Sequence, residues 1–368
     1  MKRARALMAM LAVLLLTSSC SRREQLWEKV STPPGASHIT YFAVSPGNHW
    51  FLADRQSGFW RSVDQGVTWK QINSGIQSPF GWSIQVAPDG SMIANTCSCI
   101  KPNGNPVGFY FSTDEGDRWN KISDPPGFHL SLAGAQTGCA FDTDAANLIC
   151  GGYFGQGIGW VSSRYGRSPT TTIIGDPVIG TAYGLGFNPL TKDLWLGTEQ
   201  KGVFRSTDHG FHWRQVSPSA TVLDPKGIRN GNIYGIAFDR NGNVLLSSAG
   251  GVWKSSPVES GFRWTLVLKN QNTSPGKAIG RDGAGNLYWG HTRDTHNRVV
   301  VYRSTDDGTT WSQFDFGIPP GLEGHGFVQN PSDQKVYAVI EDGPTNAGWI
   351  YRTHSRVHSD SSTGGAKP

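Results

Sequence analysis

The chain has little charge, and it lacks the patterns that build helical folds or nucleic-acid surfaces. Only 17% of its residues are charged, and no run of lysines and arginines interleaved with aromatic residues occurs. Nucleic-acid binding requires clustered cations that neutralise phosphates, so we expect no nucleic-acid partner. Long stretches with an apolar period of 3.6 residues are also missing beyond the N-terminus, which argues against a helical fold.

Glycine, proline and tryptophan are abundant instead. The 368 residues include 47 Gly, 21 Pro and 14 Trp. This composition is typical of many short strands joined by tight turns. Because all-β folds of this length often form one unit, the length does not require two domains.

The N-terminus has the order of a targeting segment. Basic residues within positions 2–5 precede an apolar run over 6–16, which is too short to be a stable bilayer anchor, and small residues lead to Cys20. This order resembles a bacterial lipoprotein signal, which implies that residues 1–20 are processed and that Cys20 is lipidated. Thr17 stands where such signals usually carry leucine, so plain secretion remains the alternative. Ser21 after the cysteine favours the outer membrane or the periplasmic face.

The charge left after this segment is small. The whole chain carries +5, of which three positive charges lie within positions 2–5, so the remainder carries +2. Four cysteines remain, an even number that is typical of disulfides in an exported protein: Cys97, Cys99, Cys139 and Cys150. Three pairings are open, although Cys139 and Cys150 flank the turn DTDAAN and could face each other across a hairpin. No CxxC pair is present, and we expect no metal and no cofactor.

An internal repeat is the strongest signal in the chain. The stretch STDDGTTW at Ser304 recurs as SVDQGVTW at Ser62, STDEGDRW at Ser112 and STDHGFHW at Ser206. Three further copies are degraded. The seven copies follow one another at 44 to 50 residues and align on Ser62, Ser112, Ser162, Ser206, Ser255, Ser304 and Thr353.

Each repeat contains four short apolar runs separated by turn residues, which predicts a four-stranded antiparallel sheet. Such a sheet cannot bury both faces alone, and radial stacking of the sheets solves this. The seventh repeat lacks its fourth strand, but LWEKVSTPPG from Leu26 matches RWNKISDPPG from Arg118. The sequence therefore predicts an all-β, seven-bladed propeller over 26–357 that closes when 27–31 pairs with the strand around 350–353. The polar tail 358–368 is predicted to be disordered.

The S-x-D-x-G-x-x-W motif resembles the Asp-box, or BNR, repeat of sialidase-like propellers. Relatives with this repeat include xyloglucan-active glycosidases, sortilin-type receptors and photosystem II assembly lipoproteins. In the motif, the aspartate accepts hydrogen bonds from backbone amides in the turn between the third and fourth strands, and glycine supplies a positive φ. We therefore expect structural roles for Asp64, Asp114, Asp208 and Asp306.

Ligands of such propellers usually gather at the opposite end of the channel. Aligning the innermost strands brings one position of each blade to that mouth: Thr40, Trp82, Thr137, Tyr183, Tyr234, Lys277 and His325. With Arg229 from a neighbouring loop, these residues suggest a polar and aromatic pocket for a glycan or a polypeptide. The alternative is that Trp82, Tyr183 and Tyr234 only pack between blades.

Catalysis is the competing interpretation of the mouth. Glu199, Glu341 and Glu323 could supply the two carboxylates that a glycoside hydrolase needs, and a tyrosine or histidine beside a cation could serve a polysaccharide lyase. His291 and His296 could share a metal, but no third ligand accompanies them. The F/Y-R-I-P motif of sialidases is absent, and one ring replaces the two of xyloglucan-active relatives. We therefore expect a monomeric, non-catalytic recognition protein, with enzyme or assembly-factor scaffold as alternatives.

Overall fold

The computed structural model describes most of the chain between residues 25 and 354. The described ranges are 25–96, 108–122, 139–151, 158–163, 171–173, 182–199, 201–217, 232–248, 250–259, 261–270, 278–291 and 299–354. The predicted leader with Cys20, the tail 358–368, Cys97 and Cys99 lie outside these ranges. No described helix is long and apolar enough to span a membrane.

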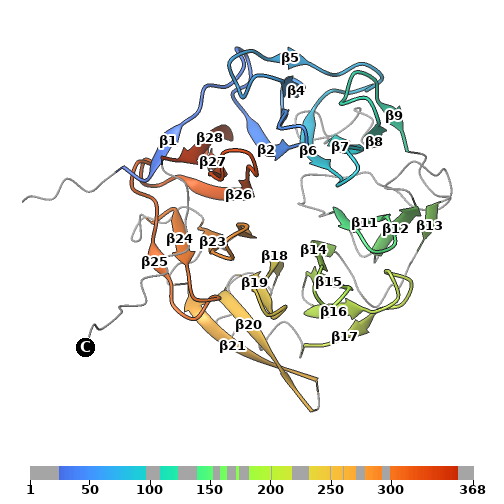
Figure 1. Ribbon diagram of the computed structural model, residues 1–368, viewed down its shortest axis with the longest axis vertical. Helices are drawn as coiled ribbons and strands as arrows, with labels where there is room; N and C mark the ends of the chain where they lie inside the picture. The colour runs from blue at the N-terminus through green and yellow to red at the C-terminus, as the bar shows by residue number, and fades with distance from the viewer. Residues whose placement is uncertain are drawn as a thin grey trace, which may run out of the picture.

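The described residues form 28 strands in seven four-stranded antiparallel sheets, arranged around a central channel (Figure 1). The prediction of an all-β propeller is confirmed. In chain order the sheets are β2–β5 (Ile39–Val44, Trp50–Asp54, Gly58–Ser62, Lys70–Gln71), β6–β9 (Gly81–Val86, Met92–Thr96, Phe109–Ser112, Asn120–Lys121), β10–β13 (Cys139–Asp142, Asn147–Gly151, Ile158–Ser163, Thr171–Ile173), β14–β17 (Ala182–Asn188, Asp193–Thr198, Val203–Ser206, Arg214–Gln215), β18–β21 (Ile233–Phe238, Val244–Ser248, Gly251–Val258, Gly261–Lys269), β22–β25 (Ile279–Arg281, Leu287–Gly290, Val301–Ser304, Ser312–Gln313), and β26, β27, β28 and β1 (Glu323–Gln329, Val336–Asp342, Ala347–Thr353, Trp27–Lys29).

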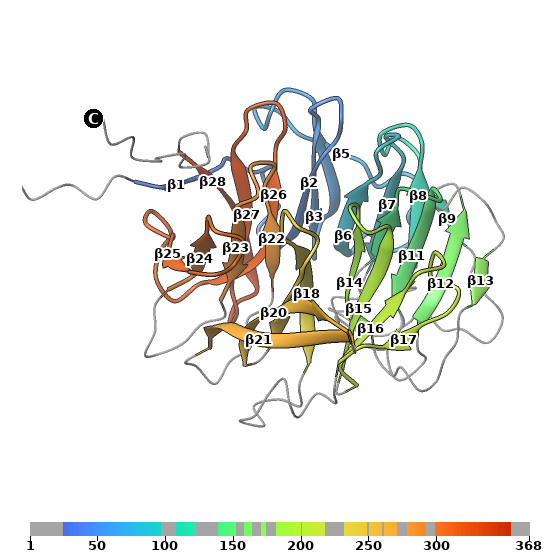
Figure 2. The ribbon, with the colours of Figure 1, turned by 60° about the horizontal axis from the view of Figure 1, so that its bottom comes forward.

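The hydrophobic core lies between neighbouring sheets. The second strand of a sheet is covered on both faces, so β3 (WFLAD), β7 (MIANT), β15 (DLWLGT) and β19 (VLLSS) are buried along their whole length. Strands that are buried on both faces carry continuous apolar runs rather than strict alternation. The outermost strands β5, β9, β17 and β25 are two residues long and exposed. Figure 2, which is turned by 60° from Figure 1, shows neighbouring sheets side by side.

The two ends of the described chain meet in one sheet. In β1, Trp27 pairs with Thr353 and Lys29 pairs with Tyr351, so the first strand supplies the outer edge of the sheet that contains β26, β27 and β28. The Trp27 side chain is fully buried, and its indole nitrogen donates a hydrogen bond to the Phe314 carbonyl. The paired segment covers three residues rather than the predicted five.

The four complete repeat motifs form the same turn. In each, the serine hydroxyl donates to the aspartate Oδ1 at 2.7–2.8 Å, and the backbone amide four residues after the aspartate donates to that same oxygen at 2.8–3.0 Å. The four aspartates are Asp64, Asp114, Asp208 and Asp306. The glycine has φ between 82° and 93°, and the residue before it also has a positive φ, which the sequence did not lead us to expect.

One of the open cysteine pairings is settled. Cys139 and Cys150 are opposite each other on β10 and β11 and form a disulfide. The cross-link closes the hairpin around the turn DTDAAN, and Cys139 lies beside the central channel.

Candidate functional site at the channel mouth

A β-bulge begins the innermost strand of five sheets. In the first sheet, Ile39 pairs with Asp54 and Tyr41 pairs with Ala53, so Thr40 is an extra residue between two register positions. The register breaks in the same way between Gly81 and Ser83, Ala182 and Gly184, Ile233 and Gly235, and Gly324 and Gly326. A bulge re-aims the side chain of its extra residue. The five extra residues are Thr40, Trp82, Tyr183, Tyr234 and His325.

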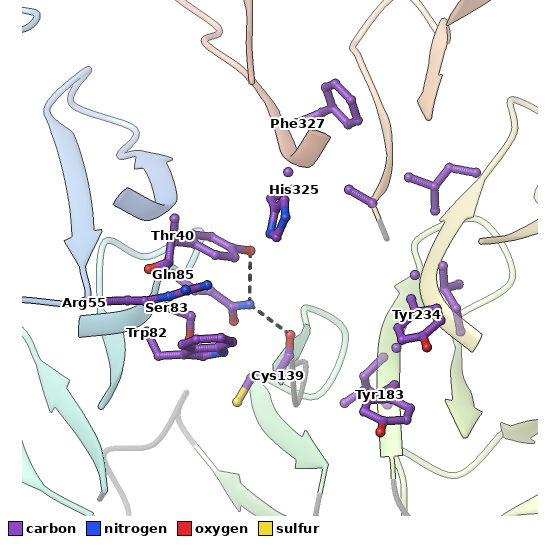
Figure 3. Close-up of a pocket in the computed structure, with 18 residues that line it drawn as sticks. Thr40, Arg55, Trp82, Ser83, Gln85, Cys139, Tyr183, Tyr234, His325 and Phe327 are labelled. Carbon is purple, nitrogen blue, oxygen red and sulfur yellow. Dashed lines mark hydrogen bonds between the residues drawn. The ribbon is translucent and has the colours of Figure 1, made fainter. Parts of the chain in front are cut away.

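These five residues, which the sequence placed at the channel mouth, line one cavity of about 260 Å³ (Figure 3). The other two predicted mouth positions, Thr137 and Lys277, lie outside the described residues, as does Arg229. Tyr41, Gln85 and Phe327 also line the cavity. Sequence reasoning misses them because a bulge breaks the alternation of side chains on which the alignment relies.

One wall of the cavity is a stack of Arg55 on Trp82. The guanidinium carbon lies 4.9 Å from the centre of the indole ring. Arg55 Nη2 lies 3.0 Å from Glu341 Oε1, and Arg55 Nη1 donates to Asn346 Oδ1 at 2.6 Å. Because Arg55 follows β3, Trp82 is on β6 and Glu341 is on β27, three sheets build this wall.

The other wall is a pair of tyrosines. The rings of Tyr183 and Tyr234 lie 5.5 Å apart with 34° between their planes, and Figure 3 shows them across the cavity from Trp82. The Asn232 side-chain amide donates to the Tyr234 hydroxyl at 3.1 Å. The two tyrosines belong to adjacent sheets, so they bridge blades and also present ring surface to the cavity.

A polar group lies between the two walls. Gln85 Nε2 donates to the Cys139 carbonyl at 3.2 Å and to the Tyr41 hydroxyl at 3.4 Å. Gln85 Oε1 is buried without a hydrogen-bond partner among the described residues. Burial raises the pKa of Tyr41, so its side chain is a neutral phenol at physiological pH. The cavity lining therefore combines a side-chain amide with a phenol hydroxyl.

The predicted carboxylates do not reach the cavity surface. Glu323 Oε2 lies 3.2 Å from His325 Nε2, and Glu341 Oε2 lies 3.0 Å from His325 Nδ1. The two acids are directly opposite each other on β26 and β27, with the imidazole in contact with both. Glu199 follows β15 and is not among the lining residues. Among the described residues, no carboxylate lines the cavity.

Two other carboxylates close to the mouth, Asp54 and Asp342, order the loops that carry them. Asp54 Oδ1 accepts the backbone amides of Gln56 and Ser57, and Asp54 Oδ2 accepts that of His38, so this carboxylate orders its own turn. Asp342 accepts the Thr345 hydroxyl at 2.6 Å. These carboxylates are committed to the loops that carry them.

The proposed pair of metal-binding histidines is not assembled in the described residues. His291 is buried with Nε2 at 2.9 Å from Asn270 Oδ1, and its ring packs edge-on against Trp289. His296 lies outside the described ranges. No group of three or more metal-ligating side chains is present in the part of the chain that the structure describes.

Comparison with known proteins places the chain among propellers. No protein-family model matches it. The xyloglucanase Xgh74A of Acetivibrio thermocellus is 24% identical over 315 residues, which cover 80% of this chain and 33% of that protein. A Paenibacillus xyloglucanase is 25% identical over 239 residues, or 55% of this chain and 23% of that protein. The chain thus spans a third or less of the length of the curated relatives that it matches.

Solved propellers share the fold at low identity. The xyloglucanase of Xanthomonas campestris has a TM-score of 0.64 at 17% identity, covering 88% of this chain and 55% of that one. YCF48 from Cyanidioschyzon merolae has a TM-score of 0.60 at 14% identity, covering 89% and 99%. A second YCF48 structure contains a bound D1 peptide. At these identities the likeness shows the fold alone.

Proposed function

We propose that this chain is a seven-bladed recognition propeller that binds a glycan or an extracytoplasmic polypeptide at its channel mouth without catalysing a reaction. The composition of the cavity supports this proposal most directly. Its described lining combines three aromatic rings of the predicted mouth with Arg55, His325 and Gln85, but it includes no carboxylate. Flat rings with a few placed polar groups are typical of ligand pockets.

The arrangement of the acids argues against a glycoside hydrolase. That reaction needs two carboxyl groups on either side of the scissile bond, about 5 to 9.5 Å apart. Here the space between Glu323 and Glu341 is occupied by His325, which contacts both. Neither carboxylate is available to a substrate in this arrangement.

Catalysis remains the second candidate because of one observation, the sequence similarity to xyloglucanases over 80% of the chain. Under that hypothesis the acids at the mouth would act on a glycan. The peptide-bound propeller supports the other half of the leading proposal, in which the ligand is a polypeptide. An assembly-factor scaffold is a further alternative.

We also propose that the chain is exported and anchored through a lipid on Cys20, on the outer membrane or the periplasmic face. The order of basic, apolar and small residues before Cys20 supports this. Mass spectrometry of the purified protein should find an acylated Cys20 at the N-terminus, and Cys20→Ser should release the protein from the membrane fraction. An unmodified, soluble wild-type protein would favour plain secretion.

Binding and product analysis together test the proposed function. The full chain in detergent is applied to a glycan array and a peptide array, and every hit is incubated and examined for products. We expect binding without turnover, and we expect Trp82→Ala and Tyr183→Ala each to lower affinity about tenfold or more, since each removes one wall. Turnover that disappears in Glu341→Gln or Glu199→Gln would establish an enzyme.

A further inference from the structure

The cavity carries no unpaired charge among its described residues. Two basic side chains line it, and each contacts a carboxylate that lies behind the lining: Arg55 contacts Glu341, and His325 contacts both Glu341 and Glu323. The basic groups of the lining are thus matched by two acids that do not line the cavity.

A charged ligand would disturb this balance. The side chains of His325 and Glu341 are 6% and 4% exposed, so water screens them poorly. A carboxylate or an ammonium brought into such a site would be desolvated without a counter-charge, which costs free energy. The described lining therefore disfavours acidic sugars, and also the end of a polypeptide, which carries a charge at physiological pH.

The size of the cavity limits the ligand further. Its volume of about 260 Å³ is just below the range of about 300 to 1,000 Å³ that is usual for drug-sized ligands. One or two sugar rings fit this volume, whereas a long stretch of polymer does not. The site is thus suited to the end of a chain.

The polar and aromatic groups match an uncharged sugar. Trp82 on one side and Tyr183 with Tyr234 on the other offer flat faces for the C–H side of a pyranose. The Gln85 amide and the Tyr41 hydroxyl line the same cavity and add polar groups between these faces. Arg55, held in place by Glu341 and Asn346, extends the first wall through its stack on Trp82.

We propose that the cavity holds the end of an uncharged glycan chain, one or two sugar rings deep, between the Arg55–Trp82 stack and the Tyr183–Tyr234 pair. This proposal rests on the recognition function proposed above and specifies its ligand. Glu341 is a positioning residue in this arrangement, since it contacts both Arg55 and His325 without lining the cavity.

Calorimetric titration of the full chain in detergent tests the ligand class. The probes are neutral cello-, xylo-, manno- and malto-oligosaccharides of one to six units, the hexose chains among them oxidised to a uronate at one end, and hexapeptides with free or capped ends. We expect a neutral series to bind, with affinity that rises to the second or third unit and then levels off. Oxidation of the bound end should weaken binding about tenfold or more.

Variants locate the binding. Gln85→Glu, which places a carboxylate in the cavity, and Tyr183→Ala should weaken the neutral ligand about tenfold. Phe211→Ala, in an exposed turn between β16 and β17 at the other end of the channel, should leave the affinity unchanged.

Three results would overturn the inference. A uronate-ended chain that binds more tightly than the neutral one, affinity that keeps rising with every added unit, or binding of peptides alone would each exclude a neutral chain end while leaving the recognition function intact. A failure of every glycan and peptide to bind would refute the recognition function as well.

Discussion

The two ends of the propeller channel use their repeated residues differently. At the end with the Ser-x-Asp-x-Gly turns, the same side chains recur, and their hydrogen bonds close within each turn, as between Ser304, Asp306 and Thr310. At the mouth, the same backbone bulge recurs in five sheets, but the residue that it presents changes from threonine to tryptophan, tyrosine and histidine. The repeated turn residues hydrogen-bond to one another and so stabilise each blade. The repeated bulges present different side chains, which together form a surface for a ligand.

This comparison predicts that mutations at the turns change stability alone and that mutations of the aromatic mouth residues change mainly binding. Mutations of the charged cluster behind the ring should change both strongly. Four experiments test it, in order of the expected effect on stability.

The largest effect is expected for Glu341→Gln. Removing one partner of a buried ion pair usually costs about 3 to 5 kcal/mol, because the remaining charge stays buried without compensation. Glu341 serves Arg55 and His325 at once. Chemical denaturation should show this loss, and ligand affinity should also fall. Glu199→Gln is the matched control, since its side chain is only partly buried and lies away from the cavity; equal losses in both variants would refute the special role of Glu341.

A smaller loss is expected for Asp306→Ala. The carboxylate accepts the buried Ser304 hydroxyl and the exposed Thr310 amide and hydroxyl. Leaving a buried donor such as the Ser304 hydroxyl unsatisfied costs about 1 to 3 kcal/mol. Asp306→Asn keeps one acceptor oxygen and should recover part of the stability. Both variants should bind ligand with unchanged affinity once folded. A tenfold change in affinity would contradict the hypothesis that the turns serve stability and the mouth serves binding.

A pH-dependent effect of similar origin is expected at Asp64. The hydroxyl and amide of Thr68, with help from Ser62, lower the pKa of Asp64 to about 2. Because this pKa is below the value of about 3.9 in an unfolded chain, the contribution to stability is complete above about pH 4 and is lost as the pH falls through 2. Thermal unfolding between pH 2 and 7 should show that the difference in melting temperature between wild type and Asp64→Asn becomes smaller as the pH falls from 4 to 2. A difference that is constant over the whole range would contradict this role of the Asp64 carboxylate.

The smallest effect on stability is expected at the mouth ring. Tyr183 is partly buried and contacts Tyr234, and an aromatic pair contributes about 0.5 to 1.5 kcal/mol. The free energy of unfolding of Tyr183→Ala should therefore differ from that of wild type by no more than this amount. Its affinity for the ligand should fall about tenfold or more. If the free energy of unfolding falls by several kcal/mol and affinity is retained in the folded protein, the ring serves packing between blades instead.

Much of the architecture is readable from the sequence. The repeat and the match between the segments at Leu26 and Arg118 predict four-stranded sheets and the pairing of β1 with β28, since both depend on patterns that local chemistry imposes. The mouth positions are also readable, because equal turns after the innermost strands place equivalent residues at equal heights. The bulges themselves are not, since a register shift depends on how two strands pair.

The disulfide and the charged cluster show the same limit. Four cysteines allow three pairings. Cys139 pairs with Cys150 because the two residues are opposite each other on the neighbouring strands β10 and β11. Glu323 and Glu341 are catalytic candidates in the sequence because carboxylates near a mouth suit hydrolysis. Their contacts with His325 arise only when β26 and β27 lie side by side.

The sequence by itself determined the repeating sheet, its turn chemistry and the residue types that surround the channel, because those depend on hydrophobic period and on hydrogen bonds within a few residues. The tertiary structure decided which of these residues meet. Arg55, Trp82 and Glu341 come from three sheets. The contacts between them, rather than any local pattern, place Glu341 behind an aromatic wall instead of on the cavity surface.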